Sequence, residues 1–302
     1  MSVIKSHCVG NGDMFHIEHN SDNFTIIDCC LTDENERRIL DEIASLSSKK
    51  GVTRFISTHP DDDHLRGLEL LDKRLGIANF YCIKNKVTKE DVTTSFTRYC
   101  ELRDDAQKAF YIQKGCSRKW MNQEGDGRDS AGISILWPNP ENVYYKDELK
   151  YAEEGGSPNN ISAVVKYELN GGATVLWMGD LETEFMENIK NELALPLVDI
   201  LFAPHHGRNS GEIPSSLLDA MAPRMVVIGE APSEHLCYYA GYHTLCQNSA
   251  GDIVFECEQG AVHVFTSNRY IVDFLRDQQR TRTGYYYAGT LVLTARAQVA
   301  AA

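Results

Sequence analysis

The residues that could do chemistry are concentrated first in the run THPDDDH, where His59, Asp61, Asp63 and His64 form an H-x-D-x-D-H pattern. Imidazole nitrogens and carboxylate oxygens are common protein ligands of divalent metals. On a loop after a strand, alternate residues can converge on one side while the next pair reaches a second point. The spacing therefore predicts two metal positions about 3.5–4 Å apart. Aspartate runs are also common in solvated turns, but two flanking histidines after an apolar segment favour the metal site.

Two further short motifs carry the same residue types. Asp180 follows Gly179 at the end of an apolar run, and one carboxylate can bridge two cations with its two oxygens. Gly-Asp is also a frequent turn, so this signal is weak by itself. His205 and His206 stand together before Gly207, where one ring could bind a metal while the other meets a substrate. The alternative for this pair is two surface histidines on a loop.

Each of the three motifs follows a segment that predicts a strand, and in layered α/β folds sites are built at strand ends. We expect Thr32 to cap the first helix, and Asn170-Gly171-Gly172 to form a hairpin turn. The predicted strands cover residues 3–9, 13–19, 23–30, 52–58, 161–169, 173–179, 197–204, 224–230, 252–257 and 261–267, and the predicted helices cover 32–51, 65–76, 180–193 and 214–222.

Residues 80–120 differ from the rest of the chain, because they hold nine Lys and Arg but five Asp and Glu, with aromatic residues between them. This composition predicts a basic, mostly helical insertion at about 80–130. It could be a solvated helical face, or a basic lip that steers an anionic substrate. Residues 121–160 are acidic and typical of loops, and residues 289–302 predict an edge strand or a frayed end. With no repeat and no long linker in the sequence, we expect one domain over residues 1–302.

The composition excludes several classes of protein. Apolar residues make up 42% and charged residues 24%, which argues against a disordered or collagen-like chain. The net charge of −13 argues against broad coating of nucleic acid, although not against a local basic groove. No run approaches the roughly 20 apolar residues of a membrane span, and the first residues carry no apolar signal core. With nine cysteines and no CxxC spacing, we expect a cytoplasmic protein with reduced thiols and no membrane insertion.

Taken together, the motifs resemble the metallo-β-lactamase superfamily, and more closely the ComEC-type competence-protein hydrolase domain in a stand-alone form. The resemblance spans roughly residues 3–80 and 130–260. It implies an α/β fold, an αββα sandwich of two mixed β-sheets flanked by helices. It also implies hydrolysis by a hydroxide that bridges two divalent metal ions, zinc or manganese. The segments that carry it are VGNGDMFHIEH, FTIIDCC, STHPDDDHLRG, SPNNISAVVKYE, VLWMGDLE and LFAPHHGRNSG, with looser matches in RMVVIGEAPSEH and CQNSAGDIVFE.

The resemblance assigns a metal role to six residues. His59 and Asp61 would hold the first metal ion, and Asp63 and His64 the second. Asp180 would bridge the two ions. His206 would be a further ligand and His205 would face the scissile phosphate, although these two could be exchanged.

Other residues would act around the metal ions. Asp28 would orient a ligand histidine, and Asp13 could do the same. Asn160 and Ser162 match an Asn-x-Ser of the family near the site. Among the candidate catalytic residues, His235 could protonate a leaving group, and Arg208, where the family has serine, could clamp a phosphate or lie on the surface.

The chain departs from the family in one respect that bears on the metal. Many superfamily hydrolases have histidine at the position of Asp61 and another histidine between the first two motifs. Here no histidine stands between His64 and His205. The first metal position is therefore oxygen-rich, which favours manganese or magnesium over zinc and allows one tight and one weak ion.

The function that the sequence predicts is a metal-dependent phosphodiesterase or nuclease acting on DNA, RNA or a nucleotide phosphodiester. A hydrolase of another ester class, such as a lactone, thioester or phosphocholine-type ester, is the alternative on the same scaffold. A catalytically silent, metal-stabilised binding protein is the third possibility. The expected partner is a nucleic acid or nucleotide substrate; a protein partner is conceivable but cannot be read from the sequence.

Overall fold

The computed structural model describes residues 1–294, whose strands form two mixed sheets. In the first sheet, nine strands follow the order β15-β14-β13-β1-β2-β3-β4-β5-β6. They are β1 (Ser2–Ser6), β2 (Phe15–Glu18), β3 (Asn23–Ile27), β4 (Val52–Ile56), β5 (Phe80–Cys82), β6 (Ala109–Tyr111), β13 (Ile253–Glu258), β14 (Ala261–Thr266) and β15 (Tyr286–Val292). The pairs from β15 to β3 are antiparallel, and those from β3 to β6 are parallel.

The second sheet repeats this change of direction. Its six strands follow the order β12-β11-β10-β9-β8-β7. They are β7 (Ile133–Trp137), β8 (Val164–Glu168), β9 (Thr174–Trp177), β10 (Ile200–Phe202), β11 (Met225–Ile228) and β12 (Thr244–Cys246). The pairs from β7 to β9 are antiparallel, whereas those from β9 to β12 are parallel. Each sheet therefore offers carboxyl ends of parallel strands at one edge, where polar loops can converge.

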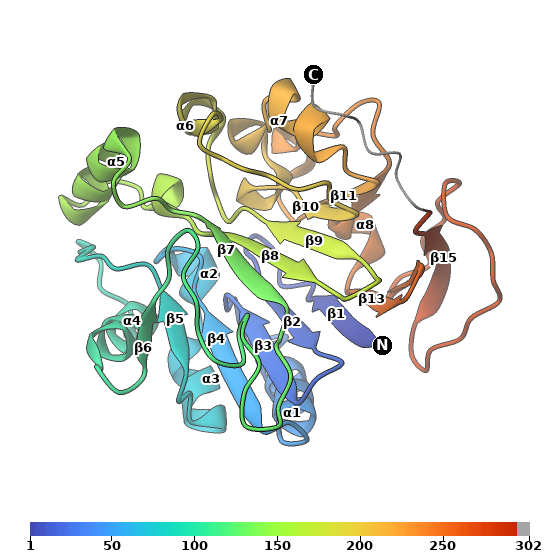
Figure 1. The fold of residues 1–302 in the computed structure, drawn as a ribbon, viewed down its shortest axis with the longest axis horizontal. Helices are drawn as coiled ribbons and strands as arrows, with labels where there is room; N and C mark the ends of the chain where they lie inside the picture. Colours follow the sequence, from blue (N-terminus) through green and yellow to red (C-terminus); the bar gives the residue numbers. More distant parts are fainter. Residues whose placement is uncertain (295–302) are drawn as a thin grey trace.

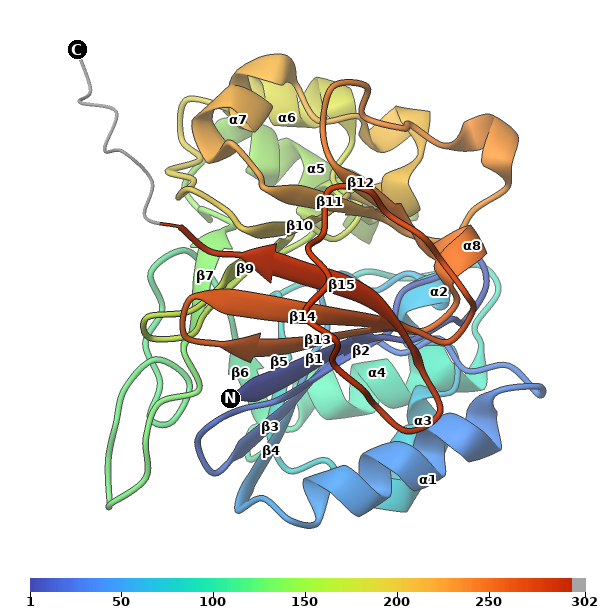
Figure 2. The same ribbon diagram turned by 90° about the vertical axis from the view of Figure 1, so that its right-hand side faces the viewer.

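Helices cover the outer face of each sheet. Figure 2 shows α1 and α3 on one outer side, α5, α6 and α7 on the other, and the two sheets between them. The helices are α1 (Glu36–Ser47), α2 (Asp62–Leu65), α3 (Leu68–Leu75), α4 (Thr94–Asp104), α5 (Val143–Glu153), α6 (Thr183–Ile189), α7 (Ser215–Met221) and α8 (Gln247–Ala250). The arrangement is the αββα sandwich expected from the sequence.

Aromatic side chains join the two sheets at the centre. Phe15 of β2 lies 4.8 Å, centroid to centroid, from Phe202 of β10, and Trp177 of β9 stacks on Phe202 at 5.1 Å. Phe255 of β13 meets Phe202 edge-on at 5.9 Å. Such pairs contribute about 0.5–1.5 kcal/mol each beyond the area that they bury. This packing fixes the spacing of the two sheets and hence of the loops at their common edge (Figure 1).

Most predicted strands and helices are present, but three local expectations are wrong. Asn35, not Thr32, is the N-cap residue of α1, and its side-chain oxygen instead accepts a hydrogen bond from the Thr32 amide. Residues 80–130 are not mostly helical: they supply α4 and the short strands β5 and β6, which extend the parallel part of the first sheet. Their apolar residues, such as Phe80, lie in these strands and in the core.

Residues 121–160 are not loop-like throughout, contrary to the expectation from the sequence. They contain β7, in which buried residues alternate with half-buried ones, and α5. Flanking glycine, proline and acidic residues obscured both elements in the sequence. The predicted edge strand near the end of the chain is β15, which pairs with β14. The remainder of that expectation, residues 295–302, lies outside the described residues.

Across residues 1–294, no helix is both long enough and apolar enough to cross a membrane.

A buried ion network ties the first strand to the edge of the site. The Asp252 carboxylate lies 3.0 Å from Lys5 Nζ and 2.7 Å from Arg38 Nη1, and it accepts a hydrogen bond from the Cys8 amide at 2.7 Å. Burial opposes the charge, but Lys5, the Cys8 amide and Arg38 hold the pKa of Asp252 below its ordinary value. The network anchors the start of the loop that leads to Asp13.

We predict that Asp252→Asn lowers the free energy of unfolding at pH 7 by about 2 kcal/mol, because the buried Lys5 then keeps only one carboxylate partner, Glu42, and Arg38 loses its charged acceptor. Asp41→Asn, in an exposed pair with Arg74, should cost at most about 1 kcal/mol. Because the pKa of Asp252 is lowered, its contribution is complete above about pH 4 and is lost as the pH falls further. Urea unfolding at pH 7, 5 and 3.5 measures this; equal losses in both variants would contradict it.

Candidate metal centre

The THPDDDH run forms a turn and the short helix α2 directly after β4. The Asp61 carboxylate caps α2 by accepting a hydrogen bond from the Asp62 amide at 2.8 Å. This turn directs the His64 ring into the interior, where it is fully buried. The local sequence therefore uses one aspartate as a helix cap and delivers a histidine to the edge between the sheets.

Glycine lets Asp180 enter the same space from the second sheet. Gly179 has a φ of +53°, and a Cβ there would lie 2.6 Å from Ser162 Oγ. That hydroxyl accepts a hydrogen bond from the Asp180 amide at 2.9 Å, so Ser162 fixes the backbone at this turn. A side chain at position 179 would displace this contact.

His205 and His206 follow β10 on a tight turn, η2 (His205–Gly207). Both histidines have positive φ, of 53° and 55°, which is uncommon for residues with a side chain. Gly229 lies close behind them, since a Cβ there would approach His206 Cα to 3.1 Å. Strain of this kind costs on the order of 1–3 kcal/mol per residue and is found at functional sites.

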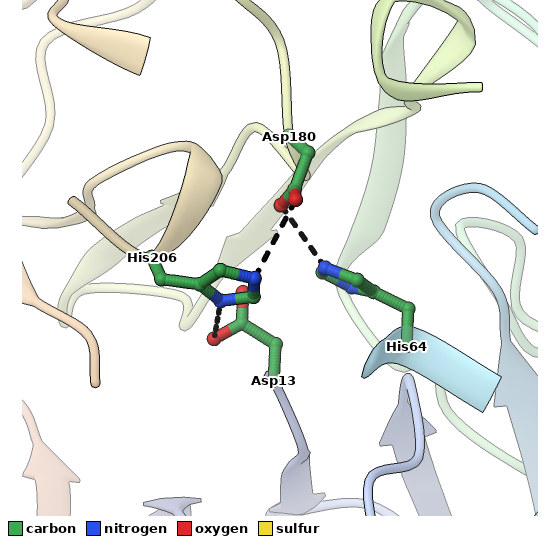
Figure 3. A group of neighbouring side chains, drawn as sticks. All are labelled: Asp13, His64, Asp180 and His206. Atoms are coloured by element: carbon green, nitrogen blue, oxygen red, sulfur yellow. Dashed lines mark ion pairs between the residues drawn. The ribbon is translucent and has the colours of Figure 1, made fainter. Parts of the chain in front are cut away.

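Four side chains from separate parts of the chain meet at this edge: Asp13, His64, Asp180 and His206 (Figure 3). Each offers one ligand atom, and these atoms lie within 4.8 Å of one another. His64 Nε2 is 3.0 Å from Asp180 Oδ1, His206 Nδ1 is 3.2 Å from Asp13 Oδ1, and His206 Nε2 is 3.5 Å from Asp180 Oδ2. We refer to this group as the four-residue cluster.

The hydrogen bonds around the cluster leave ligand atoms without partners. His64 Nδ1 lies 2.8 Å from Asp28 Oδ2 and donates to that carboxylate, which directs the lone pair of Nε2 at Asp180. Two acceptors 3.0 Å apart need a proton or a cation between them. His64 Nε2, Asp180 Oδ1 and His206 Nδ1 are buried and have no hydrogen-bond partner. The donor set of two imidazoles and two carboxylates therefore fits a divalent metal ion.

Asp28 lies where the resemblance implies, beside a histidine of the cluster. Its carboxylate accepts a hydrogen bond from the Thr58 amide at 2.8 Å and from the Thr58 hydroxyl at 2.6 Å. Since the Thr58 hydroxyl proton is used there, its oxygen accepts from His59 Nδ1 at 3.1 Å. One buried aspartate thus sets the orientation of two rings.

The charges of the cluster depend strongly on one another. Burial alone would lower the pKa of His64, but the carboxylates of Asp180 and Asp28 raise it well above its ordinary value. Burial likewise opposes the charge on His206, whose pKa Asp180 and Asp13 raise to about 10. Burial would raise the pKa of Asp180, but His64 and His206 bring it well below its ordinary value. The site thus favours positive charge between its carboxylates.

Asp13 reaches the cluster from the loop between β1 and β2, although the sequence suggested only an outer role for it. Glu230 fixes this loop by accepting hydrogen bonds from the Val9 and Gly10 amides at 2.7 and 2.8 Å. The Asp13 amide donates to the Asp63 carbonyl at 3.1 Å. The G-x-G-D pattern was the available signal, but it does not reveal the side chain's direction.

The other predicted ligands lie around the cluster rather than within it. His59 Nε2 and His205 Nε2 are each 3.9 Å from Asp180 Oδ2, and Asp63 Oδ2 is 3.2 Å from His206 Nε2. Asp61 instead pairs with Lys89 at 2.7 Å. Over residues 1–294, the four-residue cluster is the one group of potential ligands that converges. The structure therefore brings together one metal position, which includes His64, and leaves the position predicted for His59 and Asp61 less complete.

The remaining predicted site residues lie farther from the chemistry. Asn160 accepts a hydrogen bond from the Glu182 amide at 3.0 Å and so supports the loop after Asp180. Arg208 donates a hydrogen bond to Asn11, which lies on the same loop as Asp13. His235 is exposed at the end of η4 (Ser233–His235) and takes no part in the cluster.

Comparisons with known proteins concern the fold. No protein-family model and no curated protein matches the chain. Among solved structures, the metallo-β-lactamase fold protein YhfI from Bacillus subtilis is similar, with a TM-score of 0.44 and 11% identity over 82% of this chain and 96% of that one.

Two other solved structures show weaker similarity. CmlA, a diiron β-hydroxylase from Streptomyces venezuelae, gives a TM-score of 0.41 and 14% identity over 76% of this chain and 44% of that one. The metallo-β-lactamase MIM-1 from Novosphingobium pentaromativorans gives 0.34 and 12%, over 72% and 89%. We transfer no function from these similarities.

We predict that Asp28→Asn weakens binding of manganese or zinc by about 10- to 100-fold, because His64 loses the carboxylate that orients it. Isothermal titration calorimetry on metal-free protein measures this. Asp72→Asn is the matched control, since Asp72 is also a buried carboxylate but binds Arg98 and the Ile77 amide instead. Equal affinity in the wild type and Asp28→Asn would contradict the orienting role.

Proposed function

We propose that the protein is a metal-dependent hydrolase, and that its substrates are phosphodiesters of DNA, RNA or nucleotides. The observation that carries the proposal is the convergence of Asp13, His64, Asp180 and His206, together with the buried atoms His64 Nε2, Asp180 Oδ1 and His206 Nδ1, which lack hydrogen-bond partners. A bound divalent cation supplies a nucleophile at neutral pH, by lowering the pKa of water, and stabilises charge on the phosphoryl oxygens.

The chain's own residues would prepare and complete this chemistry. Asp28 holds the His64 ring, and Ser162 holds the turn that carries Asp180. His205 is half-buried, with Nδ1 3.0 Å from Ser210 Oγ and Nε2 toward Asp180. Burial lowers the pKa of His205, against the influence of Asp180, so the ring is neutral at pH 7. A neutral imidazole beside the four-residue cluster can donate a hydrogen bond to a substrate phosphoryl group or accept a proton.

The position of residues 80–120, which are rich in Lys and Arg, supports an anionic substrate. Strands β4, β5 and β6 are parallel, so the residues that follow them lie at the same edge of the sheet as the THPDDDH run. Lys84 follows β5 and Lys114 follows β6. Arg118 lies over the rings of Phe110, at 4.6 Å, and Tyr81, at 5.3 Å. This surplus of cations favours a phosphodiester over a neutral lactone or thioester.

We further propose that the bound metal is manganese or zinc and that the protein is cytoplasmic. A mixed nitrogen and oxygen donor set suits manganese or zinc. Two ions, as the family resemblance implies, would require His59, Asp61 and His205 to complete a second position beside Asp180. All nine cysteines are free thiols, which supports a cytoplasmic location.

The test is hydrolysis of bis-p-nitrophenyl phosphate, single- and double-stranded DNA, and RNA by metal-free protein given manganese, zinc or magnesium. We predict metal-dependent cleavage that Asp180→Asn lowers at least about 100-fold, since loss of a direct ligand should cost no less than loss of an outer partner. Asp72→Asn, with its carboxylate outside the cluster, should retain activity.

Other outcomes would redirect or overturn the proposal. Metal binding with cleavage of a lactone or thioester, but of no phosphodiester, would assign another ester class. Metal binding without any hydrolysis would indicate a metal-stabilised binding protein. Equal activity in the wild type and Asp180→Asn would contradict the assignment of the site.

A further inference from the structure

Lys89 brings a desolvated cation to the rim of the candidate metal centre. It lies in the segment between β5 and α4, and its side chain is only 15% exposed. Its Nζ is 2.7 Å from Asp61 Oδ1, 3.3 Å from Asp62 Oδ1 and 5.4 Å from the centre of the Phe96 ring. These contacts place the ammonium group against the first two aspartates of the THPDDDH run.

The segment that carries Lys89 is held at both ends. On one side, the Lys86 amide donates to Glu153 Oε1 at 2.7 Å. On the other, the Thr93 hydroxyl caps α4 by accepting from the Phe96 amide at 3.1 Å. Lys89 is therefore positioned by the fold and is not a freely moving surface lysine.

Asp61 is committed to partners within the protein. Its Oδ1 takes two donors, the Lys89 ammonium group and the Asp62 amide that begins α2. Together with His59 and His205, it is one of the residues that a second metal position would need. Among the described residues, however, the group of converging ligand atoms does not include Asp61.

From this arrangement we propose that the centre binds one divalent cation tightly, at the four-residue cluster, because the Lys89 ammonium group neutralises Asp61 and takes the place of a second cation. The inference rests on the metal centre of the proposed function. A positive charge beside Asp61 repels another cation, and two hydrogen bonds occupy Oδ1, one of the two oxygens that Asp61 could offer to it. Asp61 of the THPDDDH run is thus paired with a lysine from residues 80–120.

The test is metal stoichiometry and affinity, measured by calorimetry and by elemental analysis after dialysis against manganese or zinc. The wild type should retain one ion per chain and bind a second weakly. Lys89→Met removes the charge while keeping an extended side chain, and it should bind the second ion at least about 10-fold more tightly. Lys89→Arg keeps the charge and should behave as the wild type.

Lys166→Met is the matched control, because Lys166 also pairs with a carboxylate, Glu168 at 2.7 Å, and is 19% exposed. It should leave both binding steps unchanged.

A second variant keeps the test decisive if Lys89→Met does not fold. Asp61→Asn should change the affinity for the tightly bound ion less than about threefold.

Three results would overturn the inference. Two tightly bound ions in the wild type would show that Lys89 does not replace a cation. An unchanged second step in folded Lys89→Met would remove its role, as would a loss of more than about 10-fold for the tight ion in Asp61→Asn. Absence of metal binding in every variant, by contrast, would contradict the metal centre itself and with it the proposed function.

Discussion

The buried carboxylate of Asp180 is the constraint on which the site depends. It is only 2% exposed, and a charge removed from water in this way must be compensated by pairing or by a metal ion. The imidazoles of His64 and His206 face it, with His59 and His205 slightly farther away. Positive charge can reach it in two ways, as a second proton on the His64 and His206 rings or as a divalent cation between the rings and the carboxylates.

The packing of the two sheets brings loops that are distant in the sequence together at one edge, where the site lies. The His64 turn follows a parallel strand of the first sheet, while Asp180 and His206 follow neighbouring parallel strands of the second. The contacts of Phe202 with Phe15 and Phe255 of the other sheet fix the distance between the sheets. Asp13 lies on the loop after β1, whose first residues are held by hydrogen bonds to Glu230 and Asp252, far along the chain.

The features that depend on local sequence pattern could be predicted, whereas the side-chain directions and pairings that depend on long-range contacts could not. Most strands and the importance of His64, Asp180 and His206 followed from residue spacing and strand ends, whereas the αββα sandwich followed from the family resemblance. The direction of the Asp13 side chain did not, because it depends on Glu230, more than two hundred residues later. The pairing of Asp61 with Lys89 was equally inaccessible, since Asp61 fits a metal-ligand spacing and a helix cap equally well. Strand β7 and helix α5 were hidden by the loop-forming residues around them.

The most direct test of the central claim is a crystal structure of the protein soaked with Mn²⁺, with anomalous difference density measured near the manganese absorption edge. We expect a strong peak within bonding distance of His64 Nε2, Asp180, His206 and Asp13, with the Lys89 ammonium group still in contact with Asp61. A peak bound by Asp61 and not by this cluster, or no peak under conditions where manganese is bound in solution, would contradict the assignment of the four-residue cluster as the metal site.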